Sequence, residues 1–203
     1  MITLHHLNRS RSLRVLWLLE ELGQPYRVIR YERDAKSNLA PPDLLALHPL
    51  GKSPLIELDG DLVAESGAIV EILCARFGPH MVPAVGTHAH HRHLELIHFA
   101  EGSVMTPILL ALYVGTLGQA GAPLNPRINQ QLDSHFTYME QMLRPSGHFV
   151  LDGLSAVDIM LSFPASVAIR QKRGGDFPKL AGFVSAFQAR PAYQRALAQG
   201  GGD

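Results

Sequence analysis

Residues 51–67 read GKSPLIELDGDLVAESG, and this segment predicts two strands followed by a helix. Pro54 stands at the entry of the first strand, where it cannot donate a ladder hydrogen bond. The pair Asp59-Gly60 predicts a type I′ turn, because both residue types tolerate positive φ angles. Glu65 and Ser66 stand where the helix begins. The segment therefore predicts a β-hairpin that leads directly into a helix.

The residues around this hairpin alternate between strand and helix patterns. In the first predicted helix, Leu13, Leu16, Trp17 and Leu22 recur at helical spacing, and the pattern stops at Gly23. Further strands are predicted over residues 2–7 and 26–31, and further helices over residues 43–47 and 68–73. The resulting order, βαβαββα, predicts an α/β sandwich rather than a Rossmann repeat.

Strand patterns disappear in the second half of the chain. Helices are predicted over residues 93–117 with a kink at Pro107, over 125–143, from a capping box at Ser155–Asp158, and over 178–189 and 191–199. The tail, residues 200–203, is expected to be disordered. We therefore predict a first domain over residues 1–79, a linker over 80–87 that contains Pro83 and Gly86, and an all-helical domain over 88–203.

Composition excludes several functional classes. Lysine plus arginine and aspartate plus glutamate number 18 each, so no net charge attracts the chain to nucleic acid or to a membrane surface. The single cysteine, Cys74, excludes an internal disulfide and a CxxC redox pair. Neither a signal peptide nor an apolar segment of membrane-spanning length is expected. These features predict a cytoplasmic protein.

Histidines are numerous, but they do not predict a metal site. His88, His90, His91 and His93 form a cluster without cysteines or a supporting carboxylate spacing, so they are interpreted as a solvated helix start. His5 and His6 end the first strand and are interpreted as structural. No metal is predicted.

The hairpin also indicates a ligand. With a cis bond before Pro54, the backbone of Ser53 would pair with an extended peptide ligand. Glu65 and Ser66 stand at a helix N-terminus, which suits an anionic, amino-acid-like group. Together these features suit a small thiol tripeptide. The alternative is that Glu65 and Ser66 only cap their helix.

Several phrases, in the same order across nearly all of the chain, resemble the glutathione S-transferase family, and in particular its bacterial and fungal members that use a serine. They are RSLRVLWLLEEL at 11–22, LAPP at 39–42, HPLGKSP at 48–54, AEGSVMTP at 100–107 and the box at Ser155–Asp158. The resemblance implies a thioredoxin-like amino-terminal domain followed by an all-helical domain. It also implies glutathione as co-substrate and a homodimer, with the third helix of one subunit facing the fourth helix of the other.

The resemblance also implies a glutathione site. Ser53, before Pro54, resembles the backbone contact to the cysteinyl unit; many relatives carry valine here, and a backbone contact tolerates the change. Glu65 and Ser66 resemble the pair that holds the γ-glutamyl group. Lys52 is placed to approach the glycyl carboxylate or the peptide, with His48 and Lys36 as neighbours.

The loop at residues 8–12 is the candidate for thiol activation. Glutathione's thiol has a pKa near ~8.5, so a hydroxyl donor, a helix N-terminus and a guanidinium would each favour the thiolate. Ser10 lies four residues before Arg14, as in one serine-using group of the family, and is the first choice as donor. Ser12 is the alternative or the helix cap, Asn8 or Arg11 are further alternatives, and both serines could serve only as caps.

The second substrate is expected between the two domains. The wall residues expected from position and helical phase are Leu7, Phe99, Ser103, Met105 and Thr106, although core packing is the alternative for each of them. The predicted function is conjugation of the glutathione thiolate to an apolar electrophile. The alternatives are glutathione-dependent reduction of disulfides or peroxides, and a glutathione-binding regulatory module without chemistry.

Overall fold

The computed structural model describes residues 1–173 and 177–201. The chain forms two compact units. One comprises Met1–Pro79 together with the carboxy-terminal segment from Gln188, and the other comprises His80–Phe187. Each unit is described by itself.

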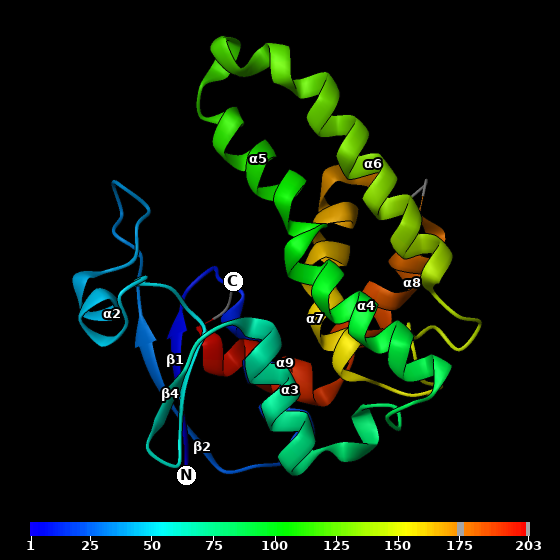
Figure 1. Cartoon of the computed structure of the whole chain (residues 1–203). Helices are drawn as coiled ribbons and strands as arrows, with labels where there is room; N and C mark the ends of the chain where they lie inside the picture. Colours follow the sequence, from blue (N-terminus) through cyan, green and yellow to red (C-terminus); the bar gives the residue numbers. More distant parts are fainter. Residues whose placement is uncertain (174–176, 202–203) are drawn as a thin grey trace. The chain divides into compact units, whose positions relative to one another are not determined.

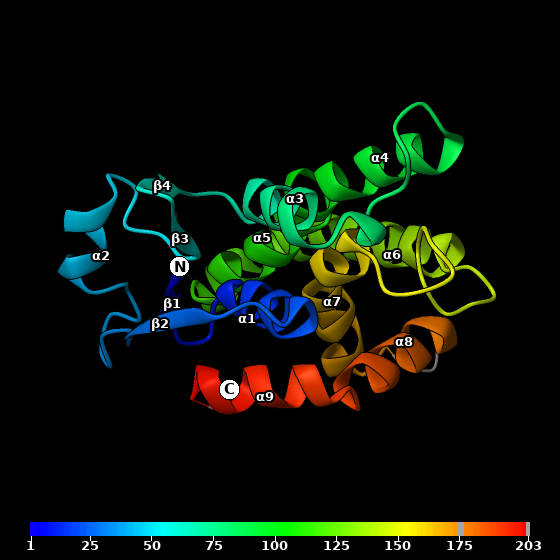
Figure 2. The same ribbon diagram turned by 90° about the horizontal axis from the view of Figure 1, so that it is seen from below.

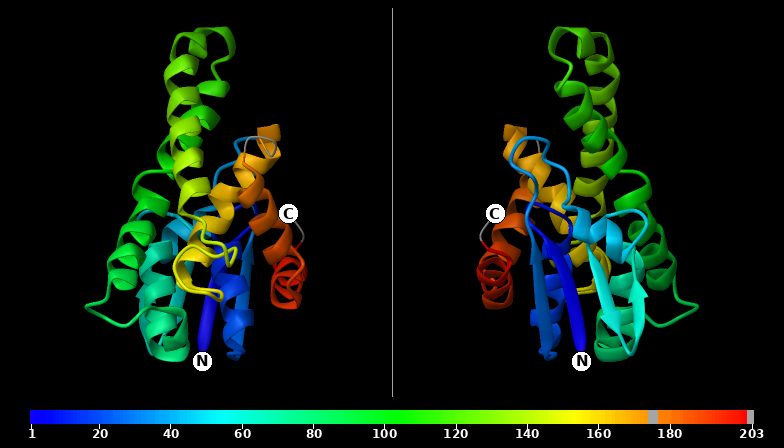
Figure 3. Two further views of the ribbon diagram at one scale, coloured as in Figure 1. Left: turned by 90° about the vertical axis from the view of Figure 1, so that its right-hand side faces the viewer. Right: turned by 90° about the vertical axis from the view of Figure 1, so that its left-hand side faces the viewer.

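The first unit contains a four-stranded mixed sheet in the order β2-β1-β3-β4. Its strands are β1 (Ile2–Leu7), β2 (Tyr26–Tyr31), β3 (Leu55–Leu58) and β4 (Asp61–Val63). β1 runs parallel to β2 and antiparallel to β3, and β3 and β4 form the predicted hairpin. Asp59 and Gly60 have φ angles of 54° and 94°, as a type I′ turn requires. Figure 3 shows the strands side by side.

Helices α1 (Ser12–Leu22), α2 (Pro42–Leu47) and α3 (Ser66–Phe77) complete the predicted βαβαββα order. Helix α1 buries nearly its whole first half, and it ends at Gly23, whose φ of 61° places it in the left-handed region. The thioredoxin-like class predicted for this half is therefore confirmed.

The last helix, α9 (Pro191–Gly200), lies against α1 within the first unit (Figures 1 and 2). The Trp17 and Tyr193 rings meet edge to face, with centroids 5.4 Å apart. Arg195 pairs with Glu20 at 2.6 Å. From the sequence, this helix is predicted to belong to the all-helical half, because no local pattern shows that it packs against α1. The domain boundaries 1–79, 80–87 and 88–203 stay a prediction.

The expectation of a disordered tail from residue 200 is wrong for its first residue. Gly200 is the last residue of α9, and Gly201 follows in the left-handed region with a φ of 94°. Gly202 and Asp203 lie outside the described residues.

The second unit is helical in its described part. Apart from the end residues Pro79 and Gln188, which belong to the first unit, it contains η1 (Pro79–Met81), α4 (His88–Gly102), α5 (Met105–Gly115), η2 (Gly118–Leu124), α6 (Asn125–Met142), α7 (Ala156–Ala168), a π-turn (Ile169–Arg173) and α8 (Pro178–Gln188). α5 and α6 run side by side and are joined by η2 (Figure 1). The largely helical second half is as predicted.

The prediction of one helix over 93–117, kinked at Pro107, is wrong. The helix breaks at residues 103–104, between α4 and α5, and Pro107 is the third residue of α5. Proline is tolerated in a first turn, because backbone N–H groups there have no intrahelical partner.

The capping box that begins α7 is present as predicted. The buried carboxylate of Asp158 accepts hydrogen bonds from the Ser155 backbone N–H at 2.7 Å and from the Ser155 hydroxyl at 2.6 Å. It also accepts one from the backbone N–H of Phe149 at 2.9 Å. A carboxylate with three donors is stable in a buried position, and this one fixes the loop that enters α7.

Among the residues that the structure describes, one segment, His88–Gly115, is long and apolar enough to span a membrane by length and composition alone. The expectation that no segment approaches that length is therefore wrong. A single segment of this kind is weak evidence for a membrane span, because core helices of soluble proteins pass the same test. Here the segment includes the break between α4 and α5.

Candidate functional site

The Ser53–Pro54 peptide bond at the entry of β3 is cis. The hydroxyl of Ser53 donates to the carbonyl oxygen of His5 at 2.8 Å and accepts from the backbone N–H of Leu7 at 3.1 Å. The β1–β3 ladder pairs His5 with Leu55, so Ser53 lies just beyond its end. The side chain of Ser53 thus continues the pairing with β1 where the proline interrupts the backbone ladder.

Glu65 and Ser66 lie at the beginning of α3. Glu65 is the N-cap residue, but its side chain makes no capping hydrogen bond, and its carboxylate is exposed. Its φ of 70° is uncommon for a residue with a side chain and costs about 1–3 kcal/mol. Capping therefore does not explain the Glu65 side chain. Ser66 is buried at the first turn of α3, close to the positive end of the helix dipole.

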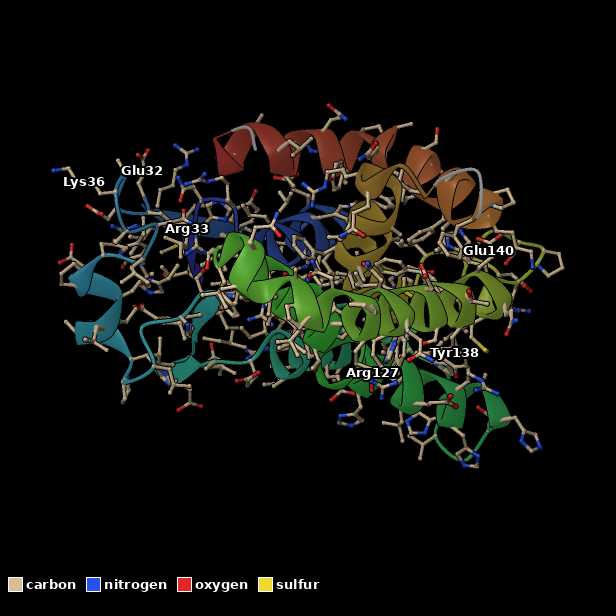
Figure 4. All side chains as sticks on the ribbon, turned by 90° about the horizontal axis from the view of Figure 1, so that it is seen from above. Glu32, Arg33, Lys36, Arg127, Tyr138 and Glu140 are labelled. Carbon is tan, nitrogen blue, oxygen red and sulfur yellow. The ribbon has the colours of Figure 1, made fainter. Side chains whose placement is uncertain are left out.

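The three other predicted glutathione contacts lie on loops and helix ends. Lys52 is exposed in the segment that precedes Ser53. His48 ends α2, and its Nδ1 accepts from the backbone N–H of Leu50 at 3.3 Å. Lys36 is exposed in a turn held by Asp34, and its side chain points outward (Figure 4). Hydrogen bonds from Ser37 and from the Lys36 backbone lower the pKa of Asp34.

The start of the loop at residues 8–12 is held by the next connection in the sheet. The side-chain oxygen of Asn8 accepts from the backbone N–H of Arg33 at 3.0 Å, and the Asn8 carbonyl accepts from Arg33 Nε at 3.2 Å. Arg9 has a positive φ of 48° and donates to the side chain of Asn38 at 3.0 Å. Arg33, which is labelled in Figure 4, therefore holds the start of the loop, and sequence reasoning missed it.

The two serines of this loop lie in contact. Their hydroxyl oxygens are 2.7 Å apart, and Ser10 Oγ also accepts from the backbone N–H of Ser12 at 3.2 Å. Ser12 is fully buried, and its hydroxyl lies 2.8 Å from Nδ1 of His6. Arg11 is the N-cap of α1 and makes no side-chain capping bond. The hydroxyl that serves the first turn of α1 is thus that of Ser10, whereas Ser12 points into the fold.

His6 is a second residue that sequence reasoning missed, since it was interpreted only as structural. It is 1% exposed, and its Nε2 lies 3.2 Å from the carbonyl oxygen of Gly200. The available signal was the alternation of β1, which places His6 on the same face as Ile2 and Leu4. Nothing local predicted Gly200 as its partner.

The expected second-substrate residues belong to both units. Leu7 is buried against Leu44 and Leu55 in the first unit. In the second unit Phe99 stacks on His135, with ring centroids 5.7 Å apart, and Met105 is buried. Ser103 is half-buried and Thr106 is exposed, with its hydroxyl donating to Gly102 at 3.3 Å. Leu7 and Met105 are buried, as the core alternative expects, whereas Phe99 is half-buried.

Cys74 is buried, and the four histidines of the cluster contact one another in pairs. Burial, with a smaller effect from Glu71, raises the pKa of the Cys74 thiol to about 12. The rings of His88 and His91 lie 6.1 Å apart, and those of His90 and His93 lie 5.9 Å apart. Within residues 1–173 and 177–201, no group of three or more histidine, cysteine, aspartate or glutamate side chains could hold a metal ion.

Comparison with known proteins yields one family. The model of the glutathione S-transferase N-terminal domain matches residues 1–73. Glutathione S-transferase 3 of Schizosaccharomyces pombe is 34% identical over 84% of this chain and 75% of its own length. Glutathione S-transferase 1 of Saccharomyces cerevisiae is 27% identical over 95% of this chain and 92% of its own. A crystal structure of a glutathione S-transferase from Actinobacillus pleuropneumoniae superposes with a TM-score of 0.89 at 29% identity, covering 100% of this chain and 94% of that one.

Proposed function

This chain belongs to the glutathione S-transferase family, and we propose which of its residues carry out the reaction of that family. It is a transferase that conjugates glutathione through its thiolate. The observation that carries the proposal is the strained Glu65 at the start of α3. Its carboxylate is exposed and makes no capping bond, which suits a group held for a ligand.

In the proposed complex, the α-amino group of the γ-glutamyl unit pairs with the carboxylate of Glu65. Its α-carboxylate lies at Ser66, where the hydroxyl and the N-terminus of α3 favour an anion. The main chain of Ser53, before Pro54, pairs with the cysteinyl unit in an extended, strand-like contact. Lys52 approaches the glycyl carboxylate, and His48 and Lys36 are outer neighbours.

Ser10 is the proposed hydroxyl at the sulfur. It is half-buried at the start of α1, in contact with Ser12, and Arg11 lies beside it in sequence. A lowering of the thiol pKa by one unit corresponds to about 1.4 kcal/mol, which a single charge-assisted hydrogen bond can supply. Asn8 is an alternative donor through its amide NH2, since its side-chain oxygen accepts from the backbone N–H of Arg33.

The second substrate is proposed to be an apolar electrophile, with Ser103 and Thr106 as the accessible candidates in its pocket. We further propose a cytoplasmic homodimer in which α3 of one subunit faces α4 of the other. Ile72 of α3 and Leu94 of α4 support this, because they are 37% and 38% exposed in the single chain although both are large and apolar.

Calorimetric titration with glutathione tests the pocket. Glu65→Gln and Ser66→Ala are each expected to weaken binding about tenfold or more, the loss of roughly one hydrogen bond to a charged group. Ser134→Ala, in the other unit and on an exposed hydroxyl, is the matched control. Affinities equal to that of the unaltered protein in both pocket variants would place glutathione elsewhere.

A further inference from the structure

A continuous line of hydrogen-bonding atoms runs from the candidate serine into the fold. It passes from Ser10 Oγ to Ser12 Oγ at 2.7 Å, from Ser12 Oγ to His6 Nδ1 at 2.8 Å, and from His6 Nε2 to the carbonyl oxygen of Gly200 at 3.2 Å. Ser12 and His6 are buried, whereas Ser10, at the outer end, is half-buried. The line therefore connects the proposed thiol site with α9.

The Gly200 carbonyl at the inner end of the line determines the direction of each hydrogen bond. The Gly200 carbonyl can only accept, so Nε2 of His6 carries a hydrogen. In a neutral imidazole Nδ1 is then an acceptor, and it receives the single proton of the Ser12 hydroxyl. The carbonyl of Leu7, a second acceptor for that proton, is farther away at 3.4 Å. Ser10 Oγ, at 2.7 Å, could also accept it, but Ser10 has a proton of its own to donate whereas the neutral Nδ1 has none, so both contacts are hydrogen bonds only when the Ser12 proton is directed at His6.

The same assignment of protons fixes the hydrogen-bond direction at Ser10. With its own proton directed at His6, Ser12 Oγ accepts the proton of the Ser10 hydroxyl. Ser10 then has no proton for a sulfur atom, and its remaining lone pair is an acceptor. While His6 is neutral, Ser10 can therefore receive a thiol proton but cannot donate to a thiolate.

We propose that His6 takes the proton of the glutathione thiol through Ser10 and Ser12. The S–H bond breaks as Ser10 Oγ receives that proton, Ser10 passes its own proton to Ser12, and Ser12 passes its own to Nδ1 of His6. One S–H bond is lost and one N–H bond is formed, and the electron pair stays on sulfur. All three hydrogen bonds then point toward the thiolate. This inference rests on the proposed placement of the thiol at Ser10.

The surroundings of His6 fit an acceptor that is held in place. Its ring is bonded at both nitrogens, and it lies so close to Gly200 that a Cβ at that residue would be 3.3 Å from Nε2. The Gly200 carbonyl would stabilise the imidazolium, and the thiolate that forms with it supplies the opposite charge. His6 never touches the substrate; it is a positioning residue that acts through the two serines.

Proton release on binding tests the relay without any substitution. The protein is mixed with glutathione in weakly buffered solution containing a pH indicator, about two units below the free thiol pKa of ~8.5. Thiolate absorbance is recorded in the same sample, and S-methylglutathione, which has no thiol proton, gives the background proton change. The relay predicts close to zero protons released per thiolate formed. Release of about one proton per thiolate would overturn it.

Two variants sharpen the test. His6→Gln keeps an N–H for the Gly200 carbonyl but cannot take a proton, so each thiolate formed should release about one proton and kcat should fall about 10²-fold with little change in KM. His5→Gln is the matched control, a buried histidine of β1 whose ring bonds Tyr31 and Glu57 instead. It should keep the near-zero count, and an effect equal to that of His6→Gln would contradict the relay.

The outcomes separate the two claims. If glutathione binds without any thiolate absorbance, the proposed function fails and the relay fails with it. If thiolate forms with release of about one proton, the proposed function stands and the relay is wrong. Should His6→Gln not fold, the proton count of the unaltered protein decides alone.

Discussion

Arg190 holds the carboxylate of Glu21 with two parallel hydrogen bonds, Nε to Oε1 at 2.6 Å and Nη2 to Oε2 at 2.9 Å. Trp17 Nε1 donates to the same carboxylate at 2.8 Å. The pair joins the start of α9 to α1, and the Gly200 carbonyl at the other end of α9 accepts from His6. The geometry of the candidate thiol site therefore depends on a helix that lies far away in sequence.

This arrangement predicts a stability loss in acid. Burial alone would raise the pKa of Glu21, but hydrogen bonds from Arg190 and Trp17 and the charges of Arg190 and Arg195 leave the pKa lowered. A lowered pKa gives stability that is complete above the ordinary value of 4.5 and is lost as the pH falls through the folded value. Glu21→Gln should cost about 1 kcal/mol at neutral pH and remove part of the acid dependence. Denaturant unfolding at several pH values measures both, and an unchanged pH profile in the variant would be inconsistent with this role.

Ser53 is expected to contribute to stability through its hydroxyl. Ser53→Ala leaves the Leu7 N–H and the His5 carbonyl without their side-chain partner and should destabilise the fold by about 1–3 kcal/mol. Ser53→Thr, which keeps the hydroxyl, is the control. Thermal unfolding measures the difference, and equal stability of the two variants would show that these bonds contribute nothing.

Ser10→Ala should lower turnover more than it lowers affinity. The lost hydroxyl acts on the forming thiolate, so kcat is expected to fall about 10²-fold, whereas glutathione is held by groups outside the loop. Steady-state kinetics with an aryl halide and calorimetry with glutathione give the two quantities. Full activity in Ser10→Ala would move the donor role to Ser12, Asn8, Arg11 or a backbone amide. Activity confined to a disulfide or hydroperoxide substrate would instead favour the reductase.

Gly200→Ala is expected to disturb the His6 ring. A Cβ at this position would lie 3.3 Å from His6 Nε2 and 3.4 Å from Cε1, closer than ordinary van der Waals contacts. Catalytic turnover should fall several-fold even though alanine favours a helix by up to about 1 kcal/mol. Gly182→Ala in α8 is the control, because a Cβ there has no neighbour within 4 Å among the described residues. Turnover and thermal unfolding are measured for both variants. Equal turnover in the two would show that α9 does not influence the thiol site.

Local patterns predicted most of the fold. The Asp59-Gly60 turn, the hairpin and the Ser155–Asp158 box follow from neighbouring residues, so their chemistry is visible in the sequence. Pro107 misled the prediction of α4 and α5, because the same residue that kinks a helix interior is accommodated in a first turn. The identity of the elements was therefore predicted better than their ends.

Contacts between distant residues could not be predicted in this way. Glu21 and Arg190 are 169 positions apart, and His6 and Gly200 are 194 apart. Neither pair has a periodic or motif signal, so α9 was assigned to the other half and His6 was interpreted as structural only. The serines at 10 and 12 were found from the sequence, but their contact with each other and with His6 required the fold.

The most direct test of the central claim is the ultraviolet thiolate absorbance of bound glutathione as a function of pH. The proposed site predicts ionisation of bound glutathione at least one unit below the pKa of ~8.5 of the free thiol, and a shift back toward that value in Ser10→Ala. Glutathione that binds with an unshifted thiol would contradict thiolate activation and would identify the fold as a binding module.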